Sequence, residues 1–372
     1  MSEGPFGGLD NMEYTLTKQK IMLLINTARK HDINHLSIEE PYFHNTILDI
    51  EFKDEHYLVS LRGKSTFDYC TGLDNYCHSS DIPGFLDYKD CLISSGLIHF
   101  DNWNEFVDWV EYLYRTEIDP TLSSKSVFLS IDSNLAYFRF ISRRFPLDTD
   151  KGQISAEDFD YLLSTIVESE VDHHIRDKYG NSDLKMMGMY TNIGDIRYNF
   201  RNRGKLMTRK AKFATQELSY LRGNLNAARV RGNVSKTDAE KNDIRIVESL
   251  ERFSWDKNIA TALISTDRNM GSHAENSEIP YFILEIPHSI DRQHEVSSSV
   301  VLNLLHDLAL TFGAVKIPEM QVTLFGIWGG KTDKDYREEA VQAWVNPGSP
   351  LNDSIKRDMA VIQSLVNIPV LP

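Results

Sequence analysis

The chain has 372 residues, of which 41% are hydrophobic and 25% charged, the composition of an ordinary globular protein of two or three domains. Its apolar runs, such as 21–25, are much too short to cross a bilayer, and its first residues lack the basic flank and apolar stretch of a secretory signal. We therefore expect a cytoplasmic protein without a membrane partner. The formal net charge of −14 would argue against a nucleic-acid partner if it were evenly spread along the chain.

Residues 1–122 mix helical and strand patterns and contain no motif that indicates chemistry. The stretches 15–31 and 102–117 have the periodicity of amphipathic helices, and 45–63 alternates like paired strands. We expect an α+β N-terminal domain here, whose role would be to bind a protein partner or a second copy of the chain.

From residue 123 to 290 the pattern changes to alternating strands and helices. Strands are predicted at 126–132, 259–266 and 281–286, and helices at 134–145, at 155–179 with Ser155 as its cap, and from Asp243 onward. This order predicts a parallel sheet flanked by helices.

The C-terminal extension, 291–372, begins with a long apolar helix at 297–313. Two strands are predicted at 315–328, and a last helix near 355–365. This extension either packs on the central sheet or forms a small separate domain.

Two acids are expected at the carboxyl ends of parallel strands, where open α/β sheets bind ligands. Asp132 ends the strand 126–132, and Asp267 follows the strand 259–266 directly. A helix N-cap is the alternative role for Asp132.

Two further acids are expected on the apolar faces of helices. Glu170 falls on the same face as Val167 and Val171, whereas Glu168 and Asp172 point away. Asp243 projects onto the apolar face at the start of its helix, where a cap is again the alternative. Four carboxylates directed at one place repel one another, and Mg²⁺ or Mn²⁺ relieves the repulsion by taking oxygen ligands.

Four stretches carry these acids: "VFLSIDSNLAYFRF", "STIVESEVDHHI", "NDIRIVESL" and "ALISTDRNMGSHAENSEIPYFIL". In this order they resemble the four signatures of PIN-domain nucleases, most closely those of the RNA-processing and RNA-decay branches. The resemblance covers about 125–290. The long insertion at about 180–240, between the second and third acids, departs from the family pattern.

The resemblance implies a PIN-like parallel sheet and a Mg²⁺- or Mn²⁺-dependent endonuclease that hydrolyses phosphodiester bonds, most often in RNA. The implied catalytic and metal-binding residues are Asp132, Glu170, Asp243 and Asp267, supported by Ser133, Asn134 and Thr266. Two alternatives stay open: a PIN-fold nucleic-acid-binding or scaffold subunit without catalysis, and a DNA nuclease of the flap type.

The insertion is strongly basic within an acidic chain. Between residues 194 and 236 there are eleven lysines and arginines against two acids. We expect this segment to bind nucleic acid, RNA more than DNA, through backbone phosphates. The residues concerned are Arg197, Arg201, Arg203, Lys205, Arg209, Lys210, Lys212, Arg222, Arg229 and Arg231. A solvated helix face is the alternative reading of such a charge run.

Two weaker patterns are not expected to bind ligands. The glycine-rich stretch 326–332 lacks the glycine five positions before its Gly-Lys pair, so a phosphate-binding loop is not favoured. Cys70, Cys77 and Cys91 contain no C-x-x-C pair, which argues for reduced thiols rather than a zinc site or a disulfide framework.

Overall fold

The structure is a computed structural model that describes residues 12–72, 81–118, 126–194, 204–233 and 239–366. The chain divides into two compact units, each assembled from separate segments of the sequence. The first unit comprises 1–91, 178–206 and 291–372, and the second comprises 92–177 and 207–290. Within the described ranges, every helix is too short or too polar to span a membrane.

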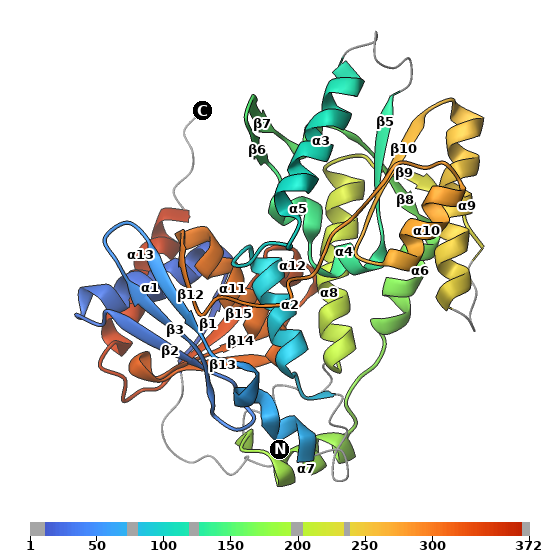
Figure 1. The fold of residues 1–372 in the computed structure, drawn as a ribbon. Helices are drawn as coiled ribbons and strands as arrows, with labels where there is room; N and C mark the ends of the chain where they lie inside the picture. Colours follow the sequence, from blue (N-terminus) through green and yellow to red (C-terminus); the bar gives the residue numbers. More distant parts are fainter. Residues whose placement is uncertain (1–11, 73–80, 119–125, 195–203, 234–238, 367–372) are drawn as a thin grey trace. The chain divides into compact units, whose positions relative to one another are not determined.

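The first unit is built on an eight-stranded antiparallel sheet that combines N-terminal and C-terminal strands (Figure 1). Across the sheet the order is β1 (Met12–Leu16), β15 (Val341–Val345), β14 (Val322–Phe325), β13 (Ala314–Ile317), β2 (His35–Glu39), β3 (Thr46–Phe52), β4 (Tyr57–Leu61) and β12 (Gln293–Val296). The strands β13, β14 and β15 of the C-terminal extension pair between β1 and β2, so the extension is part of the sheet of the first unit and not a separate domain.

Helices cover one face of this antiparallel sheet. The helix α11 packs against β13, β14 and α1, and α1 also packs against α13. The helices of this unit are α1 (Lys18–Lys30), α2 (Phe85–Ser95), α7 (Asn181–Tyr190), α11 (Ser298–Phe312), α12 (Asp333–Arg337) and α13 (Asn352–Val366). The chain passes from the first unit to the second within α2. Short 3₁₀ helices occupy Lys64–Gly72 and Pro318–Met320.

The glycine-rich stretch after β14 has a packing role. A Cβ atom at Gly326 would lie 2.3 Å from the backbone of α11, so only glycine fits there. The Nζ of Lys331 donates to the carbonyls of Gly326 and Ala340 and lies over the rings of Trp328 and Tyr336. This lysine closes the loop on itself, in agreement with the expectation that the stretch is not a phosphate-binding loop.

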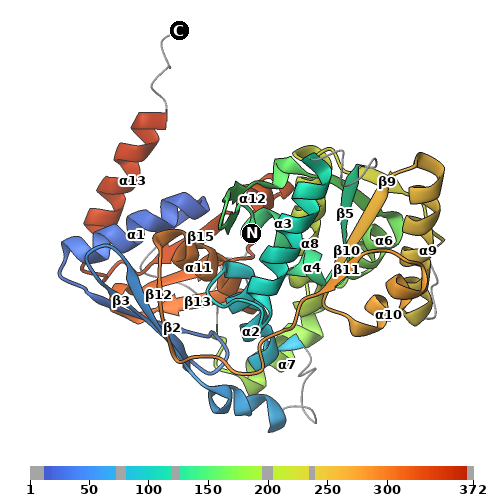
Figure 2. The ribbon, with the colours of Figure 1, turned by 45° about the horizontal axis from the view of Figure 1, so that its top comes forward.

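The second unit contains the predicted parallel sheet flanked by helices (Figure 2). Its strands lie in the order β11 (Tyr281–Ile283), β10 (Ala260–Ser265), β5 (Val127–Ile131), β8 (Asp160–Ser164) and β9 (Ala228–Val230), and all four pairings are parallel. The helices are α3 (Trp103–Ile118), α4 (Ser133–Tyr137), α5 (Phe140–Arg144), α6 (Thr165–His174), α8 (Leu206–Gly223), α9 (Ala239–Lys257) and α10 (Arg268–Asn276). A hairpin of β6 (Leu147–Thr149) and β7 (Gly152–Ile154) precedes β8.

Two sequence-based helix predictions were wrong in this unit. The stretch 155–179 is a 3₁₀ helix (Ala156–Asp158), then β8, then α6. Four of the five residues of β8 are buried, as expected for a strand covered on both faces of a parallel sheet. The helix expected at 134–145 is interrupted at Arg139, whose φ of 53° lies in the left-handed region.

The strand order reverses direction at the middle of the sheet. From β5 the chain proceeds to β8 and β9 on one side, and then returns to β10 and β11 on the other. The carboxyl ends of β5 and β10 therefore meet at a topological switch point, the position where open parallel sheets form their ligand crevices.

Candidate functional site

Asp132 follows β5 at this switch point and is buried, with 1% of its surface exposed. Its carboxylate accepts hydrogen bonds from the N–H of Leu135 at 2.8 Å, from the Oγ of Ser265 and from the backbone N–H of Thr266. Burial raises the pKa of Asp132 to about 6, although all three hydrogen bonds oppose the rise. The expected N-cap role is confirmed, because the Leu135 bond caps α4.

Asp267 lies beside Asp132, and hydrogen bonds of the Ser265 hydroxyl link the two residues. Ser265, the last residue of β10, donates its hydroxyl to Asp132 and accepts the backbone N–H of Asp267 at 2.8 Å. The negative charge of Asp267 adds to the rise in the pKa of Asp132. Asp267 itself caps α10 by accepting the N–H of Asn269 at 2.8 Å. Ser265 is thus a bridge between two acids.

Glu170 and Asp243 lie on two helices that pack against each other, α6 and α9. The Oε1 of Glu170 accepts a hydrogen bond at 3.1 Å from the Nδ2 of Asn242, the residue before Asp243. Both acids are partly exposed. Burial raises the pKa of Tyr137 in α4 to about 12, and the charge of Glu170 adds to this rise while Lys210 opposes it. Glu170 therefore lies near α4, the helix that Asp132 caps.

All four acids belong to the carboxyl edge of the parallel sheet. Asp132 and Asp267 follow β5 and β10, and Glu170 lies in the helix that follows β8 directly. The helix α9 runs into β10, so its first turns, with Asp243, start at the same edge. Among the described residues, however, no three acid, histidine or cysteine side chains come close enough together to hold one metal ion. Of these four acids, Asp132 and Asp267 are joined by a hydrogen-bonded side chain, that of Ser265.

The buried acid of α6 is Glu168, not Glu170, so the predicted orientation of these two side chains was wrong. Glu168 accepts hydrogen bonds from Arg222 at 3.2 Å and from the Nε and Nη2 of Arg229, the first of these at 3.0 Å. Leu163, which helped to define the expected apolar face, lies in β8 instead, and the buried face of α6 contains Ile166 and Glu168. The two arginines neutralise Glu168, as burial of a carboxylate requires.

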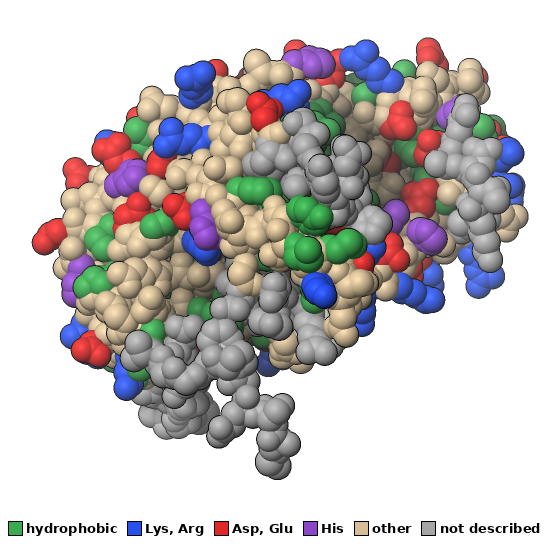
Figure 3. All heavy atoms as spheres, turned by 90° about the horizontal axis from the view of Figure 1, so that it is seen from below, with side chains coloured by type: hydrophobic (Ala, Val, Ile, Leu, Met, Phe, Trp, Pro, Cys, Tyr) green, Lys and Arg blue, Asp and Glu red, His purple; other side chains and the backbone are tan. Residues whose placement is uncertain are grey.

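The basic residues do not form one exposed arm. Arg209 is 1% exposed and its side chain is part of the core, and Lys205 belongs to the first unit, where it pairs with Asp81 at 3.6 Å. The predictions for Arg197, Arg201 and Arg203 lie outside the described residues. On the face drawn in Figure 3, lysine and arginine side chains are interspersed with acidic ones.

Three of the predicted basic residues, other than the two that pair with Glu168, reach the surface of the second unit. Lys210 and Lys212 are partly exposed on α8, and Arg231 is exposed after β9. Lys210 also acts electrostatically on Tyr137, beside Glu170. Lys210 is thus the basic residue that geometry connects to the acids.

The three residues expected to support the acids differ in their contact with Asp132. Thr266 contributes its backbone N–H to Asp132, whereas Ser133 is half-buried and Asn134 is exposed. Sequence reasoning missed Ser265, although its position as the last strand residue before "TDRN" was a usable signal. In a parallel strand, residues two apart face the same side, so Ser265 and Asp267 were candidates for a joint role.

No protein-family model matches the chain, and comparison with curated proteins gives no match. The assignment of a function therefore depends on the arrangement of the residues.

Proposed function

We propose that the protein is a Mg²⁺- or Mn²⁺-dependent endonuclease that hydrolyses phosphodiester bonds, with RNA as its substrate. The observation that carries this proposal is the pair of adjacent carboxylates, Asp132 and Asp267, bridged by Ser265 at the switch point of a parallel sheet. The order of the five parallel strands, with acids after three adjacent ones, supports the PIN-like fold that the sequence resembles.

The chemistry of this pair fits a hard divalent cation. Asp132 is buried, and its hydrogen-bond donors in the described part of the chain are two backbone amides and a hydroxyl, none of which carries a positive charge. A second carboxylate lies beside it. Two neighbouring carboxylates without a cationic side chain between them repel each other, and a hard divalent cation with oxygen ligands relieves this repulsion.

In this proposal the two acids hold the cation directly, and Ser265 fixes their separation. Glu170 and Asp243, at the same edge of the sheet, would add negative charge to this site. The cation supplies an activated water and charge stabilisation for an in-line displacement at phosphorus. Asn242 orients Glu170.

The substrate would be held by its phosphates. Lys210 lies near Glu170 and Tyr137, so a phosphate bound there is adjacent to the acids. Arg231 offers a second exposed cation on the same unit. Two cations next to an acidic site suit a single strand of nucleic acid, whose backbone they contact while the acids act on one linkage.

A second candidate, a nucleic-acid-binding or scaffold subunit without catalysis, is favoured by one observation. The described residues contain no compact group of three or more possible metal ligands. This candidate keeps the fold and the Lys210 surface but predicts no cleavage.

The test is a cleavage assay with Mn²⁺ or Mg²⁺ on single-stranded RNA, hairpin RNA and flapped DNA. We expect cleavage of single-stranded RNA by the wild type, and loss of at least about a hundredfold in Asp132→Asn. The matched control is Asp172→Asn, an exposed acid of α6, which should retain full activity. Preference for flapped DNA would identify a DNA nuclease. RNA binding without cleavage by any form would establish the second candidate.

A further inference from the structure

The side chains of β15 in the antiparallel sheet of the first unit alternate between a buried and a partly exposed set. In β15, Val341, Ala343 and Val345 are buried, while Gln342 and Trp344 are partly exposed. Side chains alternate between the two faces of a strand, so the partly exposed set lines one surface.

Five residues stand side by side across this face. Successive pairings of β1, β15, β14, β13 and β2 place them in one row, in the order Glu13, Trp344, Thr323, Lys316 and Glu39. Residues directly opposite each other in antiparallel strands project to the same side. The last four residues of the row lie on four neighbouring strands and supply, in order, an indole, a hydroxyl, an ammonium and a carboxylate.

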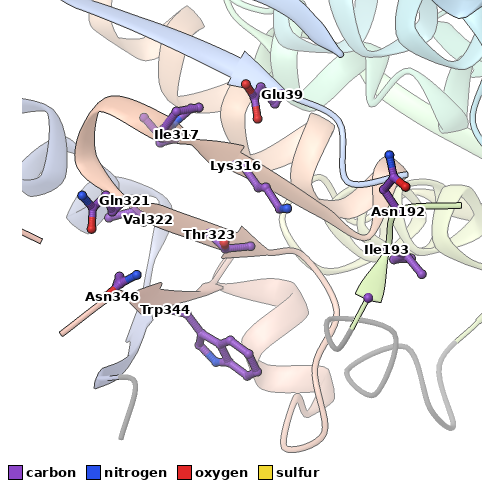
Figure 4. Close-up of a pocket in the computed structure, with 12 residues that line it drawn as sticks. Glu39, Asn192, Ile193, Lys316, Ile317, Gln321, Val322, Thr323, Trp344 and Asn346 are labelled. Carbon is purple, nitrogen blue, oxygen red and sulfur yellow. The ribbon is translucent and has the colours of Figure 1, made fainter. Parts of the chain in front are cut away.

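A cavity of about 470 Å³ lies over the last four residues of this row (Figure 4). The segment 192–194 closes one side, and Gln321 and Asn346 lie at the other. All its lining residues belong to the first unit. The volume lies in the range of sites for small molecules.

The indole of Trp344 lines the cavity, and its Nε1–H is buried. The ring of Trp344 packs against Phe325 on one side, with 4.7 Å between centroids.

The two opposite charges of the row do not pair with each other. Although Lys316 and Glu39 are cross-strand neighbours, no ion pair joins them, and the Nζ of Lys316 donates to the Nε2 of His44 at 2.7 Å. Burial lowers the pKa of His44, and Lys316 lowers it further, so the imidazole is a neutral acceptor. The ammonium of Lys316 keeps two further donors, and the carboxylate of Glu39 keeps its acceptors.

We propose that this cavity binds a small zwitterion with a planar ring, such as an aromatic amino acid. The carboxylate of the ligand accepts from Lys316 and Thr323, its ammonium donates to Glu39, and its ring lies toward Trp344. This order of groups matches the order of the row.

The charge of the face argues for a zwitterion rather than a simple anion. Glu13 and Glu39 end the row, and Glu39 is the cross-strand neighbour of Lys316. A purely anionic ligand would meet the carboxylate of Glu39, and a purely cationic one would meet the ammonium of Lys316. A neutral ligand with both charges satisfies both groups.

The experiment is isothermal titration of the full chain with L-phenylalanine, 3-phenylpropanoate, 2-phenylethylamine and L-alanine. L-phenylalanine has all three groups of the proposed ligand. 3-Phenylpropanoate lacks the ammonium, 2-phenylethylamine lacks the carboxylate, and L-alanine lacks the ring. We expect L-phenylalanine to bind, and each of the other three to bind about tenfold more weakly or worse, because each loses one set of contacts.

Two variants test which groups are used. Lys316→Met should remove the preference over 2-phenylethylamine, and Glu39→Gln should remove the preference over 3-phenylpropanoate. Lys356→Met, an exposed lysine of α13, is the matched control and should bind like the wild type. Circular dichroism confirms that each variant is folded.

Three results would overturn the proposal. They are no binding of L-phenylalanine up to about 10 mM by the folded chain, equal binding of all four probes, or unchanged preferences in Lys316→Met and Glu39→Gln. The proposal does not depend on nuclease activity, since every residue of the cavity lies in the first unit.

Discussion

Replacing Asp132 by asparagine should change stability with a sign that depends on pH. Burial raises the pKa of Asp132 from 3.8 to about 6 in the folded protein. The folded state therefore holds the proton more tightly than the unfolded state, and the contribution of Asp132 to stability is greatest below about pH 4. This contribution is lost as the pH rises through 6, because folding must then bury an ionised carboxylate.

The size of the effect follows from the shift. One pKa unit corresponds to about 1.4 kcal/mol, so ionised Asp132 costs the fold about 3 kcal/mol at neutral pH. Asparagine removes this charge but satisfies fewer of the donors from Ser265 and Thr266, a loss of about 1–2 kcal/mol. We expect Asp132→Asn to be about 1–2 kcal/mol more stable than the wild type at pH 8, and less stable at pH 4.

The assay is urea unfolding followed by tryptophan fluorescence, in EDTA, for the wild type, Asp132→Asn and the exposed control Asp172→Asn. Groups distant from Asp132 titrate alike in all three proteins, so the difference between variant and wild type reports on Asp132 and its interaction with Asp267. If the difference in unfolding free energy between Asp132→Asn and the wild type stayed constant from pH 4 to pH 8, the reasoning would be refuted. Burial would then impose no free-energy cost on the ionised carboxylate of Asp132. Added Mn²⁺ should reverse the order at pH 8 by stabilising only the wild type and the control.

Three further predictions follow from the site. Millimolar Mn²⁺ should raise the melting temperature of the wild type, with about 1.4 kcal/mol of stabilisation at ten times the Kd, and an absent shift in a thermal melt would count against the metal site. Ser265→Ala should move the acidic limb of the cleavage pH profile upward by as much as about one unit, since Asp132 loses a donor; an unchanged profile would deny Ser265 a role through Asp132. Arg229→Ala should lower the free energy of unfolding by about 1–2 kcal/mol, because Glu168 keeps only one partner. Arg231→Ala should leave the free energy of unfolding unchanged and weaken RNA binding in a filter assay. Equal losses of stability in the two variants would contradict these separate roles.

The alternating pattern of the second unit was readable because its strands and helices are long and periodic. The strands β5 and β10 and the helix α9 lie where the apolar periodicity placed them, and the parallel sheet is confirmed. The strand β8 was missed because the buried run "YLLS" leads directly into α6, and a short apolar run does not distinguish a buried strand from a helix.

The acids were identified more easily than their partners. Strand ends mark Asp132 and Asp267 in the sequence, but the expected face of a helix depends on which apolar residues are assigned to that helix. Leu163 lies in β8 rather than in α6, so the apolar face expected to contain Glu170 was defined partly by a strand residue. Arg209 shows the same limit, because a charge count does not reveal that one arginine of a basic run is packed inside.

The first unit closes around strands from both halves of the sequence, and this order has a consequence for synthesis. The strands β13, β14 and β15 lie between β1 and β2, so β2 lacks a neighbour until β13 is made and β1 lacks its neighbour until residue 345 has left the ribosome. A nascent chain carries β1 and β2 as unpaired edges while the whole second unit is being made, and such edges invite pairing with other chains. Premature termination anywhere before β15 would leave the sheet open, so aggregation rather than partial activity is the expected fate of truncated products.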